Sequence, residues 1–487
     1  MQESRLAATG VAGLDDILGG GLSVNHLYLL EGVPGSGKTT LALQFLEAGA
    51  ARGETVLYIT LSETELELRQ VAESHGWSLR GVHLVELVAS EATLDGDNYT
   101  MFHPSEVELG ATTQRILADV DRLTPSRIVI DSLSELRLLA GSPLRFRRQI
   151  LALKQYFVGR ECTVLLLDDL TSTDQDLQVQ SIAHGVIRLE QLYPEYGSER
   201  RRLMVLKYRG RGFRGGYHDY VVRRGGLDVF PRLVAAEHRQ VPSAEKMCSG
   251  VPELDQLLGG GIERGTSSLF VGAPGTGKSS LTVQFAHAAA ARGQRTALFL
   301  FDELPATLLS RAAGLGLDIA PFVADGSVIL QQVDPGELSP GALIHAVRTM
   351  VTERNVVLIV LDSLNGYLHA MPGERYLLVQ LHELLAYLGQ QGVATILVGA
   401  QSGIIGGHMT SPVDVSYLAD AILLLRYFEA DGEVRQAISV IKKRGGIHER
   451  SIREFRLTAA GIHVSPPLRQ FRGILTGVPE RQEVAPD

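Results

Sequence analysis

The sequence is poor in cysteine and in long apolar runs. Its two cysteines, Cys162 and Cys248, lie far apart and have no second ligand pair nearby, which argues against a disulfide framework and a cysteine-based zinc site. No stretch approaches the roughly 20 apolar residues of a membrane-spanning helix, and the N-terminus lacks the basic and apolar regions of a signal peptide. We therefore expect a cytoplasmic protein with no membrane partner.

Acidic residues outnumber basic ones, and lysine is rare. The formal net charge of −9 argues against a protein whose main task is to coat DNA or RNA. Only seven of the 46 Lys and Arg residues are lysine, so each lysine raises the question of whether its position requires an amine. The 487 residues suffice for two or three domains of about 150 residues each.

The chain is a tandem duplication. The segment TGVAGLDDILGGGL, which begins at Thr9, returns as SGVPELDQLLGGGI from Ser249. The segment GVPGSGKTT from Gly32 returns as GAPGTGKSS from Gly272, a displacement of 240 residues. The pairs RIVIDSL and LIVLDSL, and then LKYRG and IKKRG, follow in the same order. Each copy is the size of a domain, so the repeat indicates two similar domains.

Within each copy, short apolar runs alternate with helix-length amphipathic segments such as residues 39–52 and 112–123. This alternation predicts an α/β fold, with a mostly parallel central sheet and crossover helices on both of its faces. We expect domains over residues 1–232 and 247–473, a linker over 233–246 and a polar tail over 474–487.

Two glycine-rich loops predict nucleotide phosphate sites. Each fits G-x-x-x-x-G-K-[ST], follows an apolar strand and opens a helix. Such a loop surrounds the phosphates with backbone N–H groups, its lysine reaches the β and γ phosphates, and the next hydroxyl binds Mg²⁺. The expected ATP-binding residues are Gly35, Ser36, Gly37, Lys38, Thr39 and Thr40 in the first copy and Gly275, Thr276, Gly277, Lys278, Ser279 and Ser280 in the second.

Carboxylates at strand ends complete each candidate site. Asp131 and Asp362 end apolar strands, where open α/β sheets place ligands, and each can hold Mg²⁺ beside Thr39 or Ser279. A site that cleaves phosphate also needs a group that orients or deprotonates the nucleophile. Acidic residues at strand ends are ordinarily solvated helix caps, so this assignment depends on the neighbouring P-loops. The candidate catalytic carboxylates are Glu63, Asp302 and Glu303.

Each copy also carries a pair of cations after a strand, Lys207 with Arg209 and Lys442 with Arg444. Residues spaced i, i+2 on a strand point to one face, which suits a nucleotide phosphate tail. The alternative is a pair of exposed charges near a hairpin. Lysine at both equivalent positions of a lysine-poor chain favours the phosphate role.

These motifs resemble the KaiC family, two-domain RecA-like ATPases of the circadian clock, over nearly the whole chain. The similarity lies in the duplicated leader, both P-loops, LSET and FDEL in the places of the family's paired glutamates, GWSL, K-x-R-G in each half, and IKKRGGIHERSIREF. It implies two RecA-like domains per subunit and a homohexameric double ring, with ATP and Mg²⁺ at the subunit interfaces.

The resemblance also implies roles for single residues. The cations that would contact the nucleotide of the neighbouring subunit are Lys207, Arg209, Lys442, Arg444 and His448. The second domain of the family is an autokinase with adjacent Ser and Thr acceptors, which correspond to Ser416 and Tyr417. This chain departs from the family at Tyr417, at Asp302, which is one methylene shorter than glutamate, and at Ser62, which replaces a carboxylate.

We therefore expect an ATPase whose second domain autophosphorylates at Ser416 and which serves as a signalling or timing module. A KaiB-like protein or another signalling protein is the candidate partner, whereas the short C-terminal segment argues against a KaiA-type activator. The alternatives are a RecA-like recombinase or motor that depends on nucleic acid, and an ATP-bound assembly scaffold with little turnover. The acidic charge and the lack of a basic, aromatic module disfavour nucleic acid.

Replacing Lys38 or Lys278 by Arg keeps the charge but loses the compact ammonium group. We expect each change to weaken ATP binding or hydrolysis, whereas Lys154→Arg has little effect. Nucleotide affinity and turnover measure the difference, and equal losses in all three variants would contradict a specific need for lysine in the P-loops.

Overall fold

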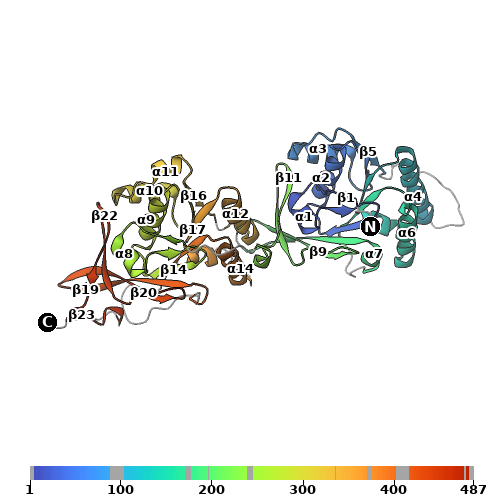
Figure 1. Cartoon of the computed structure of the whole chain (residues 1–487). Helices are drawn as coiled ribbons and strands as arrows, with labels where there is room; N and C mark the ends of the chain where they lie inside the picture. The colour runs from blue at the N-terminus through green and yellow to red at the C-terminus, as the bar shows by residue number, and fades with distance from the viewer. Residues whose placement is uncertain are drawn as a thin grey trace. The chain divides into compact units, whose positions relative to one another are not determined.

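The computed structural model describes residues 5–87, 104–170, 177–195, 197–238, 245–334, 336–369, 376–401, 416–476 and 479–481. The chain divides into two compact units, Met1–Arg232 and Leu233–Asp487, and each contains a nine-stranded sheet (Figure 1). In the described ranges, no helix is long and apolar enough to cross a membrane.

The sheet of the first unit has the order β11-β10-β9-β8-β3-β7-β6-β4-β5. The strands from β8 to β5 run parallel, and β9, β10 and β11 extend the sheet in antiparallel pairs. The strands are β3 (Leu27–Gly32), β4 (Val56–Thr60), β5 (Val82–Glu86), β6 (Arg127–Asp131), β7 (Thr163–Asp168), β8 (Gly185–Leu192), β9 (Arg200–Tyr208), β10 (His218–Arg223) and β11 (Gly226–Phe230).

The second sheet has the order β16-β15-β17-β18-β14-β19-β20-β21-β22, which is the same connectivity repeated. This confirms the predicted duplication of a mostly parallel α/β domain. The strands are β14 (Ser267–Gly272), β15 (Arg295–Leu300), β16 (Val328–Gln332), β17 (Val356–Asp362), β18 (Ala394–Ala400), β19 (Ala421–Ala430), β20 (Glu433–Lys443), β21 (Arg453–Thr458) and β22 (Gly461–Pro467). Short antiparallel pairs join β1 (Leu6–Ala7) to β2 (Leu22–Ser23), β12 (Lys246–Met247) to β13 (Ile262–Glu263) and β23 (Phe471–Arg472) to β24 (Glu480–Arg481).

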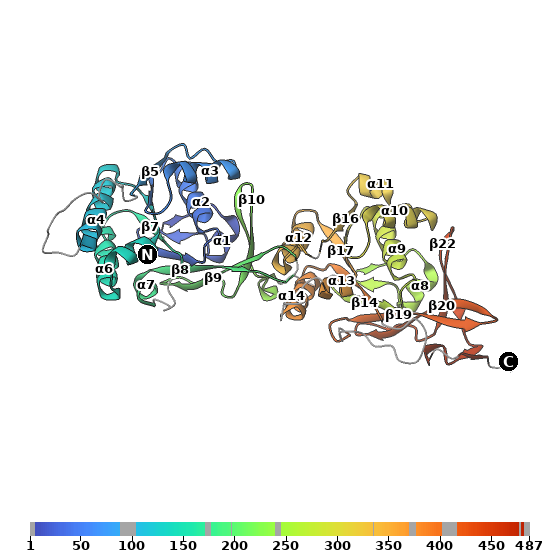
Figure 2. The same ribbon diagram turned by 180° about the vertical axis from the view of Figure 1, so that it is seen from behind.

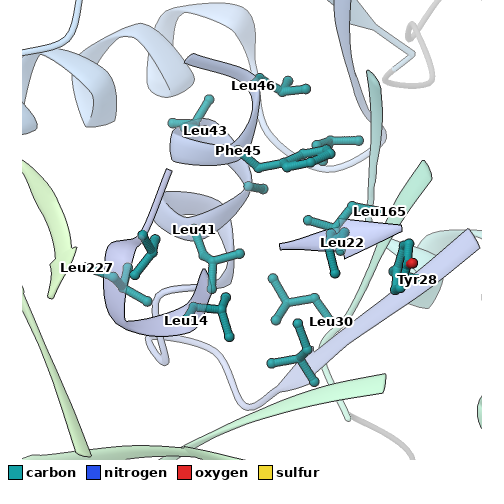
Figure 3. Close-up of a cluster of buried hydrophobic side chains, with 14 of the residues drawn as sticks. Leu14, Leu22, Tyr28, Leu30, Leu41, Leu43, Phe45, Leu46, Leu165 and Leu227 are labelled. Carbon is teal, nitrogen blue, oxygen red and sulfur yellow. The ribbon is translucent and has the colours of Figure 1, made fainter. Parts of the chain in front are cut away.

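Helices cover both faces of the first sheet (Figures 1 and 2). Successive side chains of a strand alternate between faces, so Tyr28 and Leu30 of β3 enter one apolar core and Leu27 and Leu29 enter the other. Figure 3 shows the first core, in which Leu41 and Phe45 pack beside β3. The helices of this core are α1 (Ala12–Ile17), α2 (Lys38–Ala50) and α3 (Glu65–His75), and those of the other are α4 (Pro104–Leu123), α5 (Leu133–Ala140), α6 (Pro143–Phe157) and α7 (Leu177–Ile182).

The second unit repeats this layering, with one apolar core on each face of its sheet. One face carries α8 (Pro252–Leu257), α9 (Lys278–Ala290), α10 (Pro305–Gly314) and α11 (Ala320–Ala324). The other face carries α12 (Pro340–Thr352), α13 (Leu364–His369) and α14 (Leu377–Gln390).

The segments expected as linker and tail both contain ordered structure. Ala235–His238 form a short 3₁₀ helix, η2, that packs against α14. Ile474 is 1% exposed and belongs to an apolar cluster with Phe428, so the chain is anchored at η3 (Ile474–Thr476). Residues 239–244 of the expected linker, and 477, 478 and 482–487 of the expected tail, lie outside the described residues.

A buried guanidinium ties together three segments of the first unit. Arg127 is fully buried and donates hydrogen bonds to both carboxylate oxygens of Glu54, at 2.6 and 3.1 Å. It also donates to the carbonyl oxygens of Ala8 and Phe45. Since a buried charge is costly without partners, Glu54 stabilises this arrangement.

We predict that Glu54→Ala destabilises the first unit by about 3 kcal/mol, because it leaves a buried charge unpaired. The matched control is Glu65→Ala, which removes an exposed pair with Arg69 and changes stability by less than about 1 kcal/mol. Trp77 is the sole tryptophan and packs on the core of the first unit, so its fluorescence during urea unfolding reports on this unit. Equal midpoints for the two variants would contradict the role of Glu54.

Candidate functional site

The first P-loop connects β3 to α2. Gly35 and Gly37 have φ angles of 80° and 92°, in the left-handed region that glycine adopts without strain. Gly37 immediately precedes α2, so the free N–H groups of the first helical turn face the loop. The Nζ of Lys38 donates to the carbonyl oxygens of Gly32 and Val33, at 2.7 and 3.1 Å. The loop therefore brings together the backbone donors and the ammonium group from which an anion site is built, with the ammonium group held on loop carbonyls.

A hydroxyl and a carboxylate suited to Mg²⁺ lie beside this loop. The Thr39 hydroxyl donates to Oδ2 of Asp131 at 3.4 Å, and the Tyr58 hydroxyl donates to the same oxygen. Burial raises the pKa of Asp131, and the hydrogen bond from Tyr58 opposes that rise. In the part of the chain that the structure describes, no cluster of three or more acidic, His or Cys residues forms a complete metal cage. Mg²⁺ commonly takes only one or two protein oxygens beside substrate phosphates, so Thr39 and Asp131 fit this ion.

Glu63 follows β4 and lines the same cavity as Lys38 and Asp131. Its backbone is held by a reciprocal pair of hydrogen bonds with the Thr60 hydroxyl, at 2.9 and 2.8 Å. Its Oε2 is buried and has no hydrogen-bond partner among the described residues. Burial, together with the negative charge of Asp131, raises the pKa of Glu63 to about 7. A carboxyl group that titrates near neutral pH is suited to accept a proton from water.

Asp169 is a site residue that the sequence motifs did not predict; it follows β7 and forms an ion pair with Lys38 at 2.9 Å. Burial of Asp169 opposes ionisation, but the hydrogen bond and charge of Lys38, together with hydrogen bonds from serine hydroxyls such as Ser134, hold the pKa of Asp169 below its ordinary value. The signal was an apolar strand ending in acid, TVLLLDD, the same pattern that pointed to Asp131. The cavity has a volume of about 480 Å³ and is lined by the P-loop together with Ser62, Glu63, Val71, Asp131, Asp169, Arg201 and Val222.

The second P-loop repeats the backbone geometry of the first. Gly275 and Gly277 have φ angles of 79° and 95°, and the Nζ of Lys278 donates to two loop carbonyls, those of Gly272 and Ala273, at 2.8 Å each. Burial lowers the pKa of Lys278.

Asp362 ends β17, in the place that Asp131 has in the first copy. Burial raises the pKa of Asp362, and a hydrogen bond from the Ser279 hydroxyl opposes that rise. Ser279 and Asp362 therefore form the same hydroxyl and carboxylate pair as Thr39 and Asp131.

The two sites differ in the partners of their candidate catalytic carboxylates. In the second unit Asp302 accepts a hydrogen bond from the Ser363 hydroxyl, and Glu303 forms an ion pair with Arg311 at 2.9 Å. Arg311 stands where the first copy has Val71. The second site therefore pairs Glu303 with a cation, whereas no cation forms an ion pair with Glu63 among the residues that the structure describes.

The paired cations make the same backbone contacts in both units. Lys207 donates to the carbonyl oxygen of Gln180, and Arg209 to that of Ser181, at the end of α7. Lys442 donates to the carbonyl oxygen of the candidate acceptor Ser416 at 2.8 Å.

Arg444 completes the second pair. It donates to the carbonyl oxygen of Tyr417 at 2.9 Å, and the Tyr417 side chain is 54% exposed. The backbone of the remaining candidate, His448, lies against Gly259 of the duplicated leader. In both copies the cations are thus held beside the segment that leads into β8 or β19.

The sequence also matches known proteins over nearly its whole length. The sequence model of the family described as "ATPase: KaiC" matches residues 7–234 and 247–469. The circadian clock protein KaiC3 of Synechocystis sp. is 28% identical over 481 residues, which cover 97% of this chain and 94% of that protein.

Two further relatives are named circadian clock oscillator protein KaiC. That of Parasynechococcus marenigrum is 28% identical over 99% of this chain and 94% of its own length. That of Synechococcus elongatus is 27% identical over 97% of this chain and 91% of its own length. With both copies matched by the family model and two P-loop sites in place, the chain belongs to the KaiC family of ATPases.

Proposed function

We propose that this protein binds ATP with Mg²⁺ at both P-loops, hydrolyses it, and phosphorylates itself at Ser416 in the second domain. The observation that carries the hydrolytic half is the placement of Glu63, whose buried Oε2 lacks a partner among the described residues in the cavity that Lys38 and Asp131 also line. A base, an ammonium group and a metal-binding pair in one cavity suit phosphoryl transfer.

The roles follow from the chemistry of each group. Lys38 and the N-terminus of α2 bind the phosphates, and Glu63 accepts the proton of the attacking water while the bond between the γ phosphorus and the ADP oxygen breaks. Mg²⁺, held by Thr39 and Asp131, would neutralise charge on the phosphate oxygens. In the second domain Asp302 and Glu303 are the corresponding carboxylates, and one of them takes the proton of the Ser416 hydroxyl.

We further propose a homohexamer in which the paired cations contact the nucleotide of the neighbouring subunit. Both relatives from Synechocystis and Parasynechococcus carry the name of a clock protein, which supports a signalling or timing role with a KaiB-like or other signalling protein as partner. A cation supplied across an interface stabilises charge that develops on the phosphoryl group. Hydrolysis would then depend on assembly, with Lys207 and Arg209 serving the first ring and Lys442, Arg444 and His448 serving the second.

We predict that Glu63→Gln lowers the ATP turnover of the first domain by about 10²- to 10⁴-fold, the range for loss of a general base, while nucleotide binding persists. Turnover should be measured with Lys278→Ala, which silences the second site. Because Glu63 must be ionised to act and its pKa is raised to about 7, kcat/KM should rise with pH and level off above about 7. A flat profile from pH 5 to 8, or unchanged turnover in Glu63→Gln, would dismiss this role.

We predict that the purified protein incubated with Mg²⁺ and ATP gains one phosphoryl group, measured by intact mass. Ser416→Ala should abolish the gain, whereas the matched variant Tyr417→Phe retains it. Absence of any added phosphate after long incubation would reject the autokinase and leave the ATPase standing, and phosphate retained in Ser416→Ala but lost in Tyr417→Phe would move the acceptor to Tyr417.

A further inference from the structure

The ammonium group of Lys38 has no donor left for a phosphate. A lysine ammonium has three N–H donors, and Lys38 directs them to the carbonyl oxygens of Gly32 and Val33 and to Oδ1 of Asp169. The side chain of Lys38 is 6% exposed and that of Asp169 is 27% exposed, so water screens this pair only in part.

Asp169 is held in place from a second side. The Ser134 hydroxyl of α5 donates to its Oδ2 at 3.1 Å, so the two carboxylate oxygens have different partners. The preceding residue, Asp168, is fixed by an ion pair with Arg137 of α5 at 2.6 Å. The end of β7 is therefore anchored to α5, and this anchoring directs Asp169 toward the P-loop.

The second copy has the same backbone without this carboxylate. β7 pairs with β3 so that Asp168 lies opposite Glu31, and β18 pairs with β14 so that Gly399 lies opposite Val271. Glu31 and Val271 are equivalent, because they are 240 residues apart, which is the repeat distance of the P-loops. Their partners Asp168 and Gly399 are therefore equivalent too. The next residue along the chain is Asp169 in the first copy and Ala400 in the second, so Ala400 occupies the place of Asp169.

Lys278 consequently has a different environment from Lys38. It donates to two loop carbonyls, and in the described ranges no carboxylate forms an ion pair with it. With respect to the described part of the chain, one N–H donor of Lys278 is therefore available to a phosphate.

We propose that Asp169 is a counter-ion that occupies Lys38 when no phosphate is bound and thereby makes the first nucleotide site weaker than the second. A polyphosphate must displace Asp169 from Lys38 and then lie near a carboxylate of like charge. Because no described carboxylate pairs with Lys278, a polyphosphate that binds there has no counter-ion to displace and meets no such repulsion. The inference rests on the proposed binding of ATP at both P-loops, and it makes Asp169 a residue that sets affinity rather than one that takes part in the chemical step.

The test is the affinity for a non-hydrolysable ATP analogue with Mg²⁺, measured by calorimetry on the full chain that carries Lys278→Ala. In this parent protein, Asp169→Asn keeps the size of the side chain and an acceptor for Ser134 but removes the charge. We expect the dissociation constant to fall on the order of tenfold, as for loss of one half-screened charge pair. The control Asp121→Asn removes the same charge from an exposed pair with Arg160 and should leave the affinity unchanged.

The reciprocal variant keeps the proposal testable if Asp169→Asn does not fold. In the full chain that carries Lys38→Ala, Ala400→Asp places a carboxylate beside Lys278 and should weaken binding of the same analogue by a similar factor. The inference would be overturned if the parent proteins bind the analogue and neither variant changes the affinity, or if Asp169→Asn weakens binding. Either result would leave the two proposed ATP sites standing. Failure of both parents and of the unmodified chain to bind the analogue would refute the proposed function, and this inference with it.

Discussion

The parallel pairing of β4, β6, β7 and β3 is the constraint on which the site depends. Thr60 lies opposite Asp131 in the register of β4 and β6, and Glu31 lies opposite Asp168 in that of β3 and β7. Because parallel strands end at one edge of the sheet, the chain leaves all four strands on the same side. The P-loop and the carboxylates that follow β4, β6 and β7 therefore meet in one cavity, although they are far apart in the sequence.

Most residues of this site could be predicted from local motifs. The remaining contacts could not, because they depend on the order of the strands in the sheet. The P-loops and Asp131 could be predicted because glycine spacing and an apolar strand ending in aspartate have chemical meaning over a few residues. The pairing of Asp169 with Lys38 could not, because it depends on β7 lying next to β3, and neighbouring strands in the sheet are not neighbours in the chain. The ion pair between Glu303 and Arg311 likewise depends on how α10 is turned against β15.

The two copies show how one scaffold can hold two different electrostatic environments. Substitutions at equivalent places, Val71 for Arg311 and Asp169 for Ala400, change the partners of the candidate catalytic carboxylate and of the P-loop lysine without altering the strand order. Even the buried Arg127 has an apolar counterpart, Leu358. The two copies share the backbone geometry of the P-loop, whereas side chains at the edge of the cavity set the differences between the sites.

The paired cations donate hydrogen bonds to main-chain carbonyl oxygens, so these contacts do not depend on which side chains the contacted residues carry. Lys442 and Arg444 hold the carbonyls of Ser416 and Tyr417, whose counterparts in the first copy, Gln180 and Ser181, are held in the same way. Every residue type offers that carbonyl oxygen. The side chain in this segment can therefore differ between the copies, glutamine against serine and serine against tyrosine, while the hydrogen bonds from the cations to the main chain stay the same.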